Sequence, residues 1–255
     1  MDKRKIALIT GATAGIGNAT AKKLTAQGFD VIITGRRKER LEELQGEIQK
    51  ISPEARVLPL NFDVSVYREV EANLANLSEE WKNVDVLVNN AGLAIGLNPI
   101  HQGVVDDWER MIDTNLKGLL YVTRIISQGM TERKSGHIIN IGSIASKEVY
   151  VNGNVYCATK HAVDALTKGT RMDLIHYGIK VTLVCPGFAE TEFSITRFKG
   201  DKDRADKVYD GYVPLVAEDI ADAIYYAVSA PDHVNIQDIL IMPKAQASAT
   251  IFHKE

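Results

Sequence analysis

Tyr156 and Lys160 lie four residues apart in the stretch YCATK, and both side chains can exchange protons. Residues at this spacing share one face of a helix, so a phenol and an ammonium group would lie side by side. A neighbouring positive charge favours the phenolate and lowers a pKa that is ordinarily about 10. The pair therefore predicts a tyrosine that acts as a base near neutral pH. The same spacing also arises by chance, so the surrounding elements must show what such a base would act on.

A glycine-rich segment near the N-terminus follows an apolar run and precedes a helical pattern. Ile6–Ile9 is typical of a buried strand, Gly11, Gly15 and Gly17 come next, and residues 18–27 have helical spacing of apolar side chains. Glycines let the backbone approach a pyrophosphate, and the helix N-terminus supplies free N–H groups. The spacing alone also fits a tight turn, but the flanking strand and helix favour a phosphate-binding turn.

The second expected strand, residues 30–35, ends at Arg36 and Arg37. In dinucleotide-binding folds an acidic residue here bonds the ribose 2′-OH of NAD, whereas arginine accommodates the 2′-phosphate of NADP. Arginine at both positions favours NADP, with Arg36 the preferred contact. The alternative is that both are solvated residues at the start of the next helix.

The third expected strand, residues 56–61, contains Pro59, which suits an edge strand because proline lacks the ladder donor. This agrees with a strand order of 3-2-1-4-5-6, in which the third strand is the edge. Asp63 and Val64 follow, where an adenine ring could lie. Asp63 is equally well placed to cap the helix expected over residues 67–81.

The fourth expected strand, residues 85–89, ends in Asn90, Ala91 and Gly92, small residues that leave room for a ligand beside a central strand. The helix expected over residues 105–133 contains Asn115, a poor residue for a helix interior. Asn115 therefore indicates either a mild bend or a hydrogen-bond relay beside the site.

The remaining elements alternate in the same way. A fifth strand over residues 138–142 ends at Ser143, and Pro186-Gly187 breaks the chain after the sixth. The segment at about 188–213 is polar and too long for a bare connection, which is typical of a lid. The other expected elements are a helix over 154–177, a strand over 180–185, a helix over 217–229 and a strand over 235–242. The pattern predicts one α/β, doubly wound Rossmann-like domain over residues 1–255, with a seven-stranded parallel sheet and helices on both faces.

Bulk properties fit one intracellular globular domain. The chain has 255 residues, of which 45% are hydrophobic, and its net charge of −3 argues against nucleic-acid binding. No apolar run is long enough for a membrane span. Two cysteines imply no disulfide framework, and the six histidines show no metal-ligand spacing. We therefore expect a cytoplasmic protein with no metal.

Taken together, these segments resemble the short-chain dehydrogenase/reductase family over the full length of the chain. The resemblance is carried by TGATAGIG, NNAG, Asn115, Ser143, YCATK and the pair Pro186-Gly187, in the order typical of the family. It implies a nicotinamide cofactor and a homotetramer, or else a homodimer. It also implies contacts between the cofactor and the following residues: Gly11, Thr13, Ala14, Gly15, Ile16, Gly17, Arg36, Arg37, Asp63, Val64, Asn90, Ala91, Gly92, Tyr156, Lys160, Pro186, Gly187, Ala189 and Thr191.

Carried over to this sequence, the resemblance assigns a role to each of four residues. Tyr156 is the general base in alcohol oxidation and the acid in carbonyl reduction. Ser143 hydrogen-bonds the reacting oxygen. Lys160 holds the nicotinamide ribose and depresses the pKa of Tyr156. Asn115 supports a water that leads protons from Lys160 to solvent.

A narrower similarity, carried by segments such as GRRKERL and TEFSITRFKGD, is to NADP-dependent 3-hydroxy acid dehydrogenases. It implies hydride transfer between NADP(H) and a small 3-hydroxy acid or its semialdehyde, of the L-allo-threonine, serine or 3-hydroxypropionate type. A carboxylate substrate needs a cation, and Arg197 or Lys199 could supply it unless that segment is solvated or contacts another subunit. Glu148, Val149 and Tyr150 are the expected pocket wall. The alternatives are a reductase of bulkier ketones and a catalytically silent NADP-binding sensor.

Overall fold

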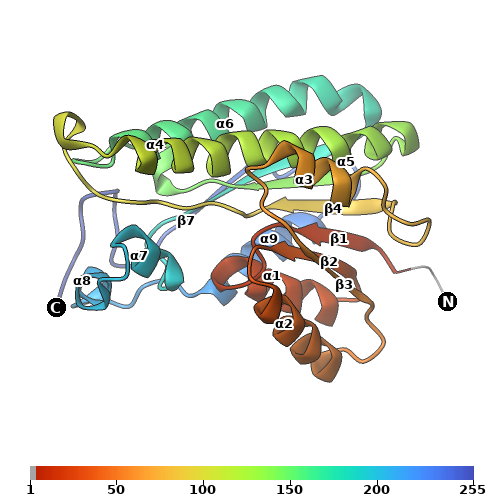
Figure 1. The fold of residues 1–255 in the computed structure, drawn as a ribbon, viewed down its shortest axis with the longest axis horizontal. Helices are drawn as coiled ribbons and strands as arrows, with labels where there is room; N and C mark the ends of the chain where they lie inside the picture. The colour runs from red at the N-terminus through yellow and green to blue at the C-terminus, as the bar shows by residue number, and fades with distance from the viewer. Residues whose placement is uncertain (1–3) are drawn as a thin grey trace.

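The computed structural model describes residues 4–255, so the first three residues of the expected domain lie outside it. Seven parallel strands form one sheet in the order β3-β2-β1-β4-β5-β6-β7, which confirms the predicted fold class (Figure 1). The strands are β1 Ile6–Ile9, β2 Asp30–Gly35, β3 Val57–Asn61, β4 Val84–Asn89, β5 His137–Ile141, β6 Lys180–Pro186 and β7 Asp238–Ile241.

Side chains of the central strands alternate between two hydrophobic cores, one on each face of the sheet. In β1, Ala7 and Ile9 belong to one core, and Ile6 and Leu8 belong to the other. Such two-sided burial explains why the strands are continuous apolar runs. β3 is an edge strand, as Pro59 predicts. Proline has no backbone N–H to donate to a neighbouring strand, and an edge strand tolerates this because it has a neighbour on one side only.

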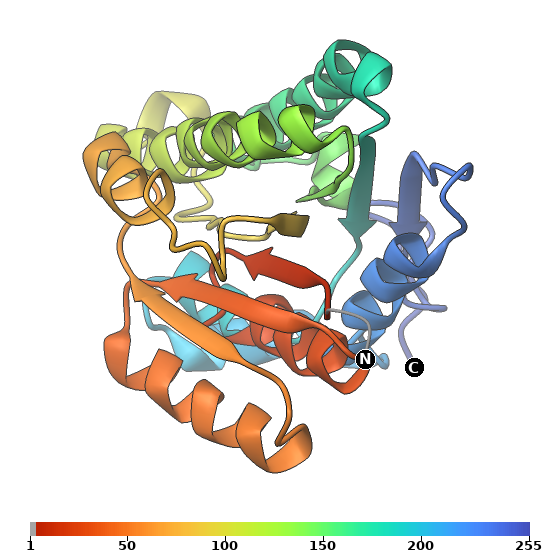
Figure 2. The ribbon, with the colours of Figure 1, turned by 90° about the vertical axis from the view of Figure 1, so that its right-hand side faces the viewer.

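Helices cover both faces, as Figures 1 and 2 show. One layer holds α1 (Gly15–Ala26), α2 (Lys38–Ile51) and α9 (Ala217–Ser229). The other holds α3 (Tyr67–Leu74), α4 (Val105–Ile112), α5 (Leu119–Arg133) and α6 (Asn154–Leu174). No helix among residues 4–255 is both long enough and apolar enough to cross a membrane.

Two expected helices differ from the structure. The helix expected over 67–81 ends at Leu74, because the chain turns around Ser78 and buries Trp81 beneath Arg56. The helix expected over 105–133 is interrupted by a π-helical segment, Asp113–Gly118, which contains Asn115. Such π turns often mark functional positions within helices.

The segment expected to be a lid contains two short helices, α7 (Glu192–Arg197) and α8 (Lys202–Asp206), beyond the carboxyl ends of the strands (Figure 1). The chain after β7 folds back onto both ends of this segment. The Phe252 ring lies 5.0 Å from the Phe188 ring and 5.3 Å from the Tyr212 ring, between centroids. The backbone N–H of Glu255 donates to the carbonyl of Gly211, at 2.9 Å.

Candidate active site

The exits of β1 and β4 are joined by a dense set of hydrogen bonds. Thr10 Oγ1 accepts from the backbone N–H groups of Asn90 and Ala91, each at 3.0 Å. Asn90 Nδ2 donates to the carbonyls of Thr10 and Gly11, at 2.9 and 3.1 Å. Gly11 has a φ of +66°, and a Cβ there would lie 2.9 Å from the Cα of Ala91. Only glycine fits this turn, because both the backbone angle and the space exclude a side chain.

Gly17 has a packing role rather than a place on the cavity surface. It is buried in the first turn of α1, where a Cβ would lie 2.5 Å from both the Gly11 carbonyl oxygen and Asn90 Nδ2. Gly17 lets α1 pack closely against the turn and does not line the cavity, so its expected contact with the cofactor stays a prediction.

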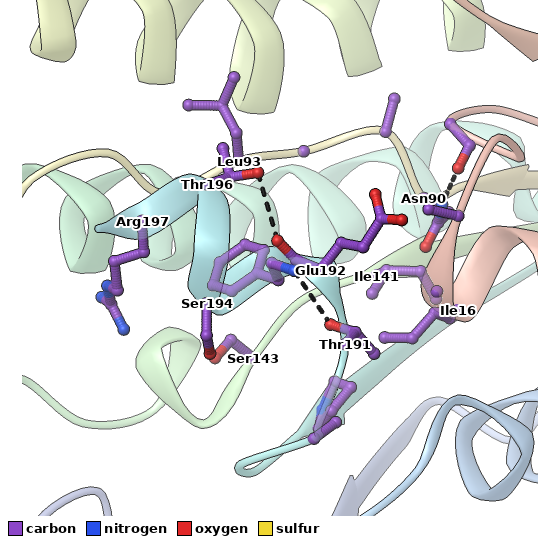
Figure 3. Close-up of a pocket in the computed structure, with 18 of the residues that line it drawn as sticks. Ile16, Asn90, Leu93, Ile141, Ser143, Thr191, Glu192, Ser194, Thr196 and Arg197 are labelled. Atoms are coloured by element: carbon purple, nitrogen blue, oxygen red, sulfur yellow. Dashed lines mark hydrogen bonds between the residues drawn. The ribbon is translucent and has the colours of Figure 1, made fainter. Parts of the chain in front are cut away.

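A cavity of about 550 Å³ lies at the carboxyl edge of the sheet, where the strand order reverses between β1 and β4. Its lining includes Gly11, Thr13, Ala14, Gly15, Ile16, Arg36, Arg37, Asp63, Val64, Asn90, Ala91, Gly92, Ser143, Tyr150, Tyr156, Lys160, Pro186, Gly187, Ala189, Thr191 and Arg197. Figure 3 shows the lid residue Glu192 between Asn90 and Arg197. α1 begins at this cavity without a side-chain cap, so its first N–H groups are available to an anion. The volume and these donors fit a dinucleotide.

Three arginines lie at the β2 end of the cavity. Arg37 donates to Thr13 Oγ1 in the glycine turn through Nε and Nη2, at 3.3 and 2.9 Å. Arg37 and Arg40 both pair with the Glu192 carboxylate of the lid. Arg36 pairs with Asp63 at 3.4 Å. Sequence reasoning missed Arg40, although it lies three residues beyond Arg37 and so shares one face of α2 with it.

Asp63 lies on the cavity surface and makes a local turn rather than a helix cap. Its Oδ1 accepts from the N–H and the hydroxyl of Ser65, and Val66 is the residue at the cap position of α3. Burial acts to raise the pKa of Asp63, but the hydrogen bonds from Ser65 and Arg36 outweigh burial and hold it below its usual value. The alternative in which Asp63 caps this helix is therefore wrong.

Ser143, Tyr156 and Lys160 line the cavity together. Ser143 follows β5 and begins a 3₁₀ turn, where its hydroxyl accepts from the N–H of Ala145 at 3.1 Å. α6 carries Tyr156 and Lys160, both buried. Lys160 Nζ donates to the carbonyl of Ile141 at 2.9 Å and lies 6.0 Å from the centre of the Tyr156 ring. The helix thus places a phenol and an ammonium group on one face, as the spacing predicts.

The charges around Tyr156 differ from the expected arrangement. Burial raises the pKa of Tyr156, and Tyr150 adds to this; Arg197 and a hydrogen bond with Ser143 act in the opposite direction. Burial lowers the pKa of Lys160 to about 8. Lys160 donates to a carbonyl here, and the prediction that it depresses the pKa of Tyr156 stays a prediction. The Arg197 guanidinium is closer, at 5.0 Å from the ring centre.

Asn115 lies behind the cavity rather than on its surface. Its Oδ1 accepts from the N–H of Leu93 at 2.8 Å, and its Nδ2 donates to the Leu93 carbonyl and to Thr159 Oγ1. A Cβ built on Gly92 would lie 3.2 Å from Asn115 Oδ1 and 3.6 Å from Lys160 Nζ. Asn115 therefore joins the exit of β4 to α6 close to Lys160. Its role as a relay stays a prediction.

Arg197 is the lid cation that reaches the cavity. Its guanidinium lies over the Tyr156 and Tyr150 rings, at 5.0 and 5.4 Å, and donates to the Tyr150 hydroxyl. Within residues 4–255 its buried Nε has no hydrogen-bond partner. Lys199 instead forms an ion pair with Asp107 at 2.7 Å. Of the two cations considered for a carboxylate, only Arg197 lines the cavity.

Of the three residues in the expected pocket wall, one lines the cavity, and Val149 is exposed instead. Tyr150 lines the cavity, but the Glu148 carboxylate points to the C-terminal segment and accepts from the N–H of Ala249 at 2.8 Å. The prediction for Glu148 is wrong because the 3₁₀ turn after Ser143 directs it away from the cavity. Sequence reasoning missed Phe193, whose ring lies 5.8 Å from that of Tyr156. Phe193 is one of several aromatic residues in the lid, so the sequence alone did not single it out.

A tyrosine and a lysine facing a dinucleotide-sized cavity are the arrangement of a nicotinamide-dependent oxidoreductase. Residues 5–202 match the short chain dehydrogenase family, and the chain belongs to that family.

The chain is 46% identical to the NADP-dependent 3-hydroxy acid dehydrogenase YdfG of Escherichia coli (strain K12) over 245 residues, which is 96% of this chain and 97% of the relative. It is 41% identical to the serine 3-dehydrogenase of Rhizobium radiobacter over 242 residues, 95% of each chain. A solved structure described as the closed form of serine dehydrogenase complexed with NADP+ has a TM-score of 0.92 at 46% identity, covering 98% of this chain and 100% of its own.

Proposed function

We propose that the protein transfers a hydride between NADP(H) and a small 3-hydroxy acid or its semialdehyde. The observation that carries this proposal is Arg197, a cation that lies against the Tyr156 ring within the cavity. A 3-hydroxy acid has a carboxylate close to its reacting hydroxyl, so both groups can engage this site at once. The relatives named NADP-dependent 3-hydroxy acid dehydrogenase and serine 3-dehydrogenase support the same substrate class.

The residues at the cavity fit NADP. The pyrophosphate suits the free N–H groups at the start of α1, and the 2′-phosphate suits the arginines that follow β2. The nicotinamide ring supplies the hydride acceptor or donor when the cofactor is bound. Gly92, Pro186 and Gly187 leave space beside Tyr156 and Lys160 for that ring and its ribose.

The chain's own groups manage the proton. Ser143 and Tyr156 hold the reacting oxygen between their hydroxyls, and Tyr156 gives up its proton in reduction and takes one in oxidation. Because burial raises its pKa, the phenol is protonated near neutral pH and ready to serve as the acid. Lys160 holds the ribose hydroxyls, and Asn115 supports proton exchange between Lys160 and solvent.

The lid, residues 188–213, closes the substrate end of the cavity in this proposal. Arg197 binds the substrate carboxylate, and the Tyr150 hydroxyl, already bonded to Arg197, fixes the direction of the guanidinium. An arginine half-buried among aromatic rings can hold a carboxylate more tightly than an exposed one, because less water competes there.

Initial rates with L-serine, L-allo-threonine and 3-hydroxypropionate, each with NADP+ and NAD+, test the proposal. We expect turnover of at least one acid, with NADP+ strongly preferred. Absence of turnover with all three, together with NADPH-dependent reduction of bulky ketones, would replace the substrate class by the ketone alternative. NADP+ binding without turnover of any substrate would favour the silent sensor.

We also propose that the enzyme is a cytoplasmic homotetramer, with a homodimer as the alternative. The family resemblance supports the assembly. The two cysteines, Cys157 and Cys185, are buried free thiols, which suits a reducing compartment. Light scattering during size-exclusion chromatography measures the mass: four times 28.1 kDa is expected, and a monomer would contradict both alternatives.

A further inference from the structure

Glu192, the first residue of α7, bridges Arg37 at the N-cap of α2 and Arg40 in its first turn. Its Oε2 lies 3.0 Å from Arg37 Nη1, and its Oε1 pairs directly with Arg40 Nη1. Hydrogen bonds from Arg40 and Arg37 outweigh burial and hold the pKa of Glu192 below its usual value, so the carboxylate is ionised at neutral pH. The three side chains are between 41% and 45% exposed, so these ion pairs can be exchanged for others.

The two arginines form a site for an anion before any ligand arrives. They share one face of α2, and Thr13 fixes Arg37 from the glycine turn. A phosphate carries more charge than a carboxylate and offers more acceptor oxygens to a guanidinium fork. Arg37, Thr13 and Glu192 also line the cavity in which we place the cofactor, beside the β2 end where a 2′-phosphate belongs.

The helix that carries Glu192 also contacts the catalytic tyrosine. Phe193 packs against the Tyr156 ring, and Arg197, the last residue of α7, lies over the same ring. In Figure 3, Glu192 and Arg197 project from the lid in opposite directions. A six-residue helix is about 9 Å long and moves as a unit, so a change at Glu192 reaches Phe193 and Arg197.

We propose that Glu192 is an internal competitor for the 2′-phosphate of the cofactor. Its carboxylate pairs with Arg37 and Arg40 in this structure, and a cofactor with a 2′-phosphate displaces it and frees the adjoining end of α7. Glu192 and Arg40 are therefore specificity residues that couple the lid to cofactor choice. This inference rests on the proposed function, because it assumes that the 2′-phosphate binds at these arginines.

Calorimetric titration with 2′,5′-ADP and with 5′-AMP tests the inference, because the two probes differ only in the 2′-phosphate. Glu192→Gln should tighten 2′,5′-ADP binding about fivefold, as expected for the loss of two half-exposed competing ion pairs. Binding of 5′-AMP should change less than about twofold. Glu190→Gln, which removes a lid carboxylate that makes no ion pair among residues 4–255, is the matched control and should change neither.

Unchanged or weaker binding of 2′,5′-ADP to Glu192→Gln would overturn the inference, as would equal tightening of both probes. In an Arg40→Gln background the effect of Glu192→Gln should shrink by at least half, because one of its two partners is gone.

Arg37→Ala and Arg40→Gln distinguish a failure of the proposed function from a failure of the competitor inference. If neither reduces the preference for 2′,5′-ADP over 5′-AMP, the placement of the 2′-phosphate in the proposed function is wrong. If both reduce it while Glu192→Gln has no effect, only the competitor inference fails. Thermal unfolding of each variant confirms that it is folded.

Discussion

The two sides of the cavity are built from different interactions. The catalytic wall, formed by Ser143, Tyr156, Lys160 and strands β4 to β6, is held by buried contacts; Tyr156 and Lys160 are 8% and 6% exposed. The lid is held by half-exposed ion pairs and by aromatic contacts with the C-terminal segment. Buried hydrogen bonds are costly to break, whereas exposed ion pairs are exchanged at little cost. In the proposed function, the groups that do chemistry are thus held rigidly, and the groups that recognise ligands can adjust.

The largest effect should come from the catalytic wall. Tyr156→Phe removes the hydroxyl that exchanges the proton and should lower kcat by about 10²–10⁴-fold. NADP+ affinity should change little, because the ring still packs against Phe193. Steady-state kinetics and fluorescence titration measure the two quantities. Tyr226→Phe, at an exposed position, is the control, and preserved turnover in Tyr156→Phe would remove the assigned acid and base.

A second prediction concerns the stability of the strands beneath the wall. Burial lowers the pKa of His137 in β5 to about 3, and nearby Lys180 adds to this. Between about pH 6.5 and 3 the unfolded chain binds a proton that the folded chain does not, so stability falls as the pH is lowered, by up to about 1.4 kcal/mol per pH unit.

Chemical unfolding at several pH values measures that slope. His137→Gln should lose this part of the slope, while His101→Asn, at an exposed position, should keep it. An unchanged slope in His137→Gln would show that β5 does not carry the pH dependence.

The smallest expected effect concerns the lid. Phe252→Ala removes the ring that packs between Phe188 and Tyr212 at the two ends of the lid. Each such aromatic pair is worth about 0.5–1.5 kcal/mol, so we expect a rise in substrate KM of about threefold, with kcat nearly unchanged. Ile251→Ala, at the neighbouring exposed residue, is the control. A fall in kcat without a change in KM would place the C-terminal segment in the chemistry instead.

The fold and the catalytic wall could be predicted from the sequence because their determinants are local. Continuous apolar runs define the strands, parallel order brings their carboxyl ends together, and helical spacing alone places Tyr156 beside Lys160. Pro59 even identified an edge strand.

Contacts of the lid could not be predicted because they join segments far apart in the chain. Glu192 pairs with Arg40, 152 residues away, and Glu148 bonds Ala249, 101 residues away. The electrostatics of Tyr156 were missed for the same reason, since its nearest cation, Arg197, comes from the lid rather than from its own helix. No spacing rule reports such pairs.

The central claim is that the lid recognises the substrate carboxylate while the catalytic wall does the chemistry. One ratio tests it most directly: kcat/KM for 3-hydroxypropionate divided by kcat/KM for its uncharged methyl ester. Arg197→Met keeps an apolar chain over Tyr156 but removes the charge, and Lys199→Met is the matched control. We predict that Arg197→Met lowers the ratio by about 10–100-fold, the value of a charge-assisted hydrogen bond, while Lys199→Met leaves it unchanged. An unchanged ratio in Arg197→Met would contradict carboxylate recognition by the lid.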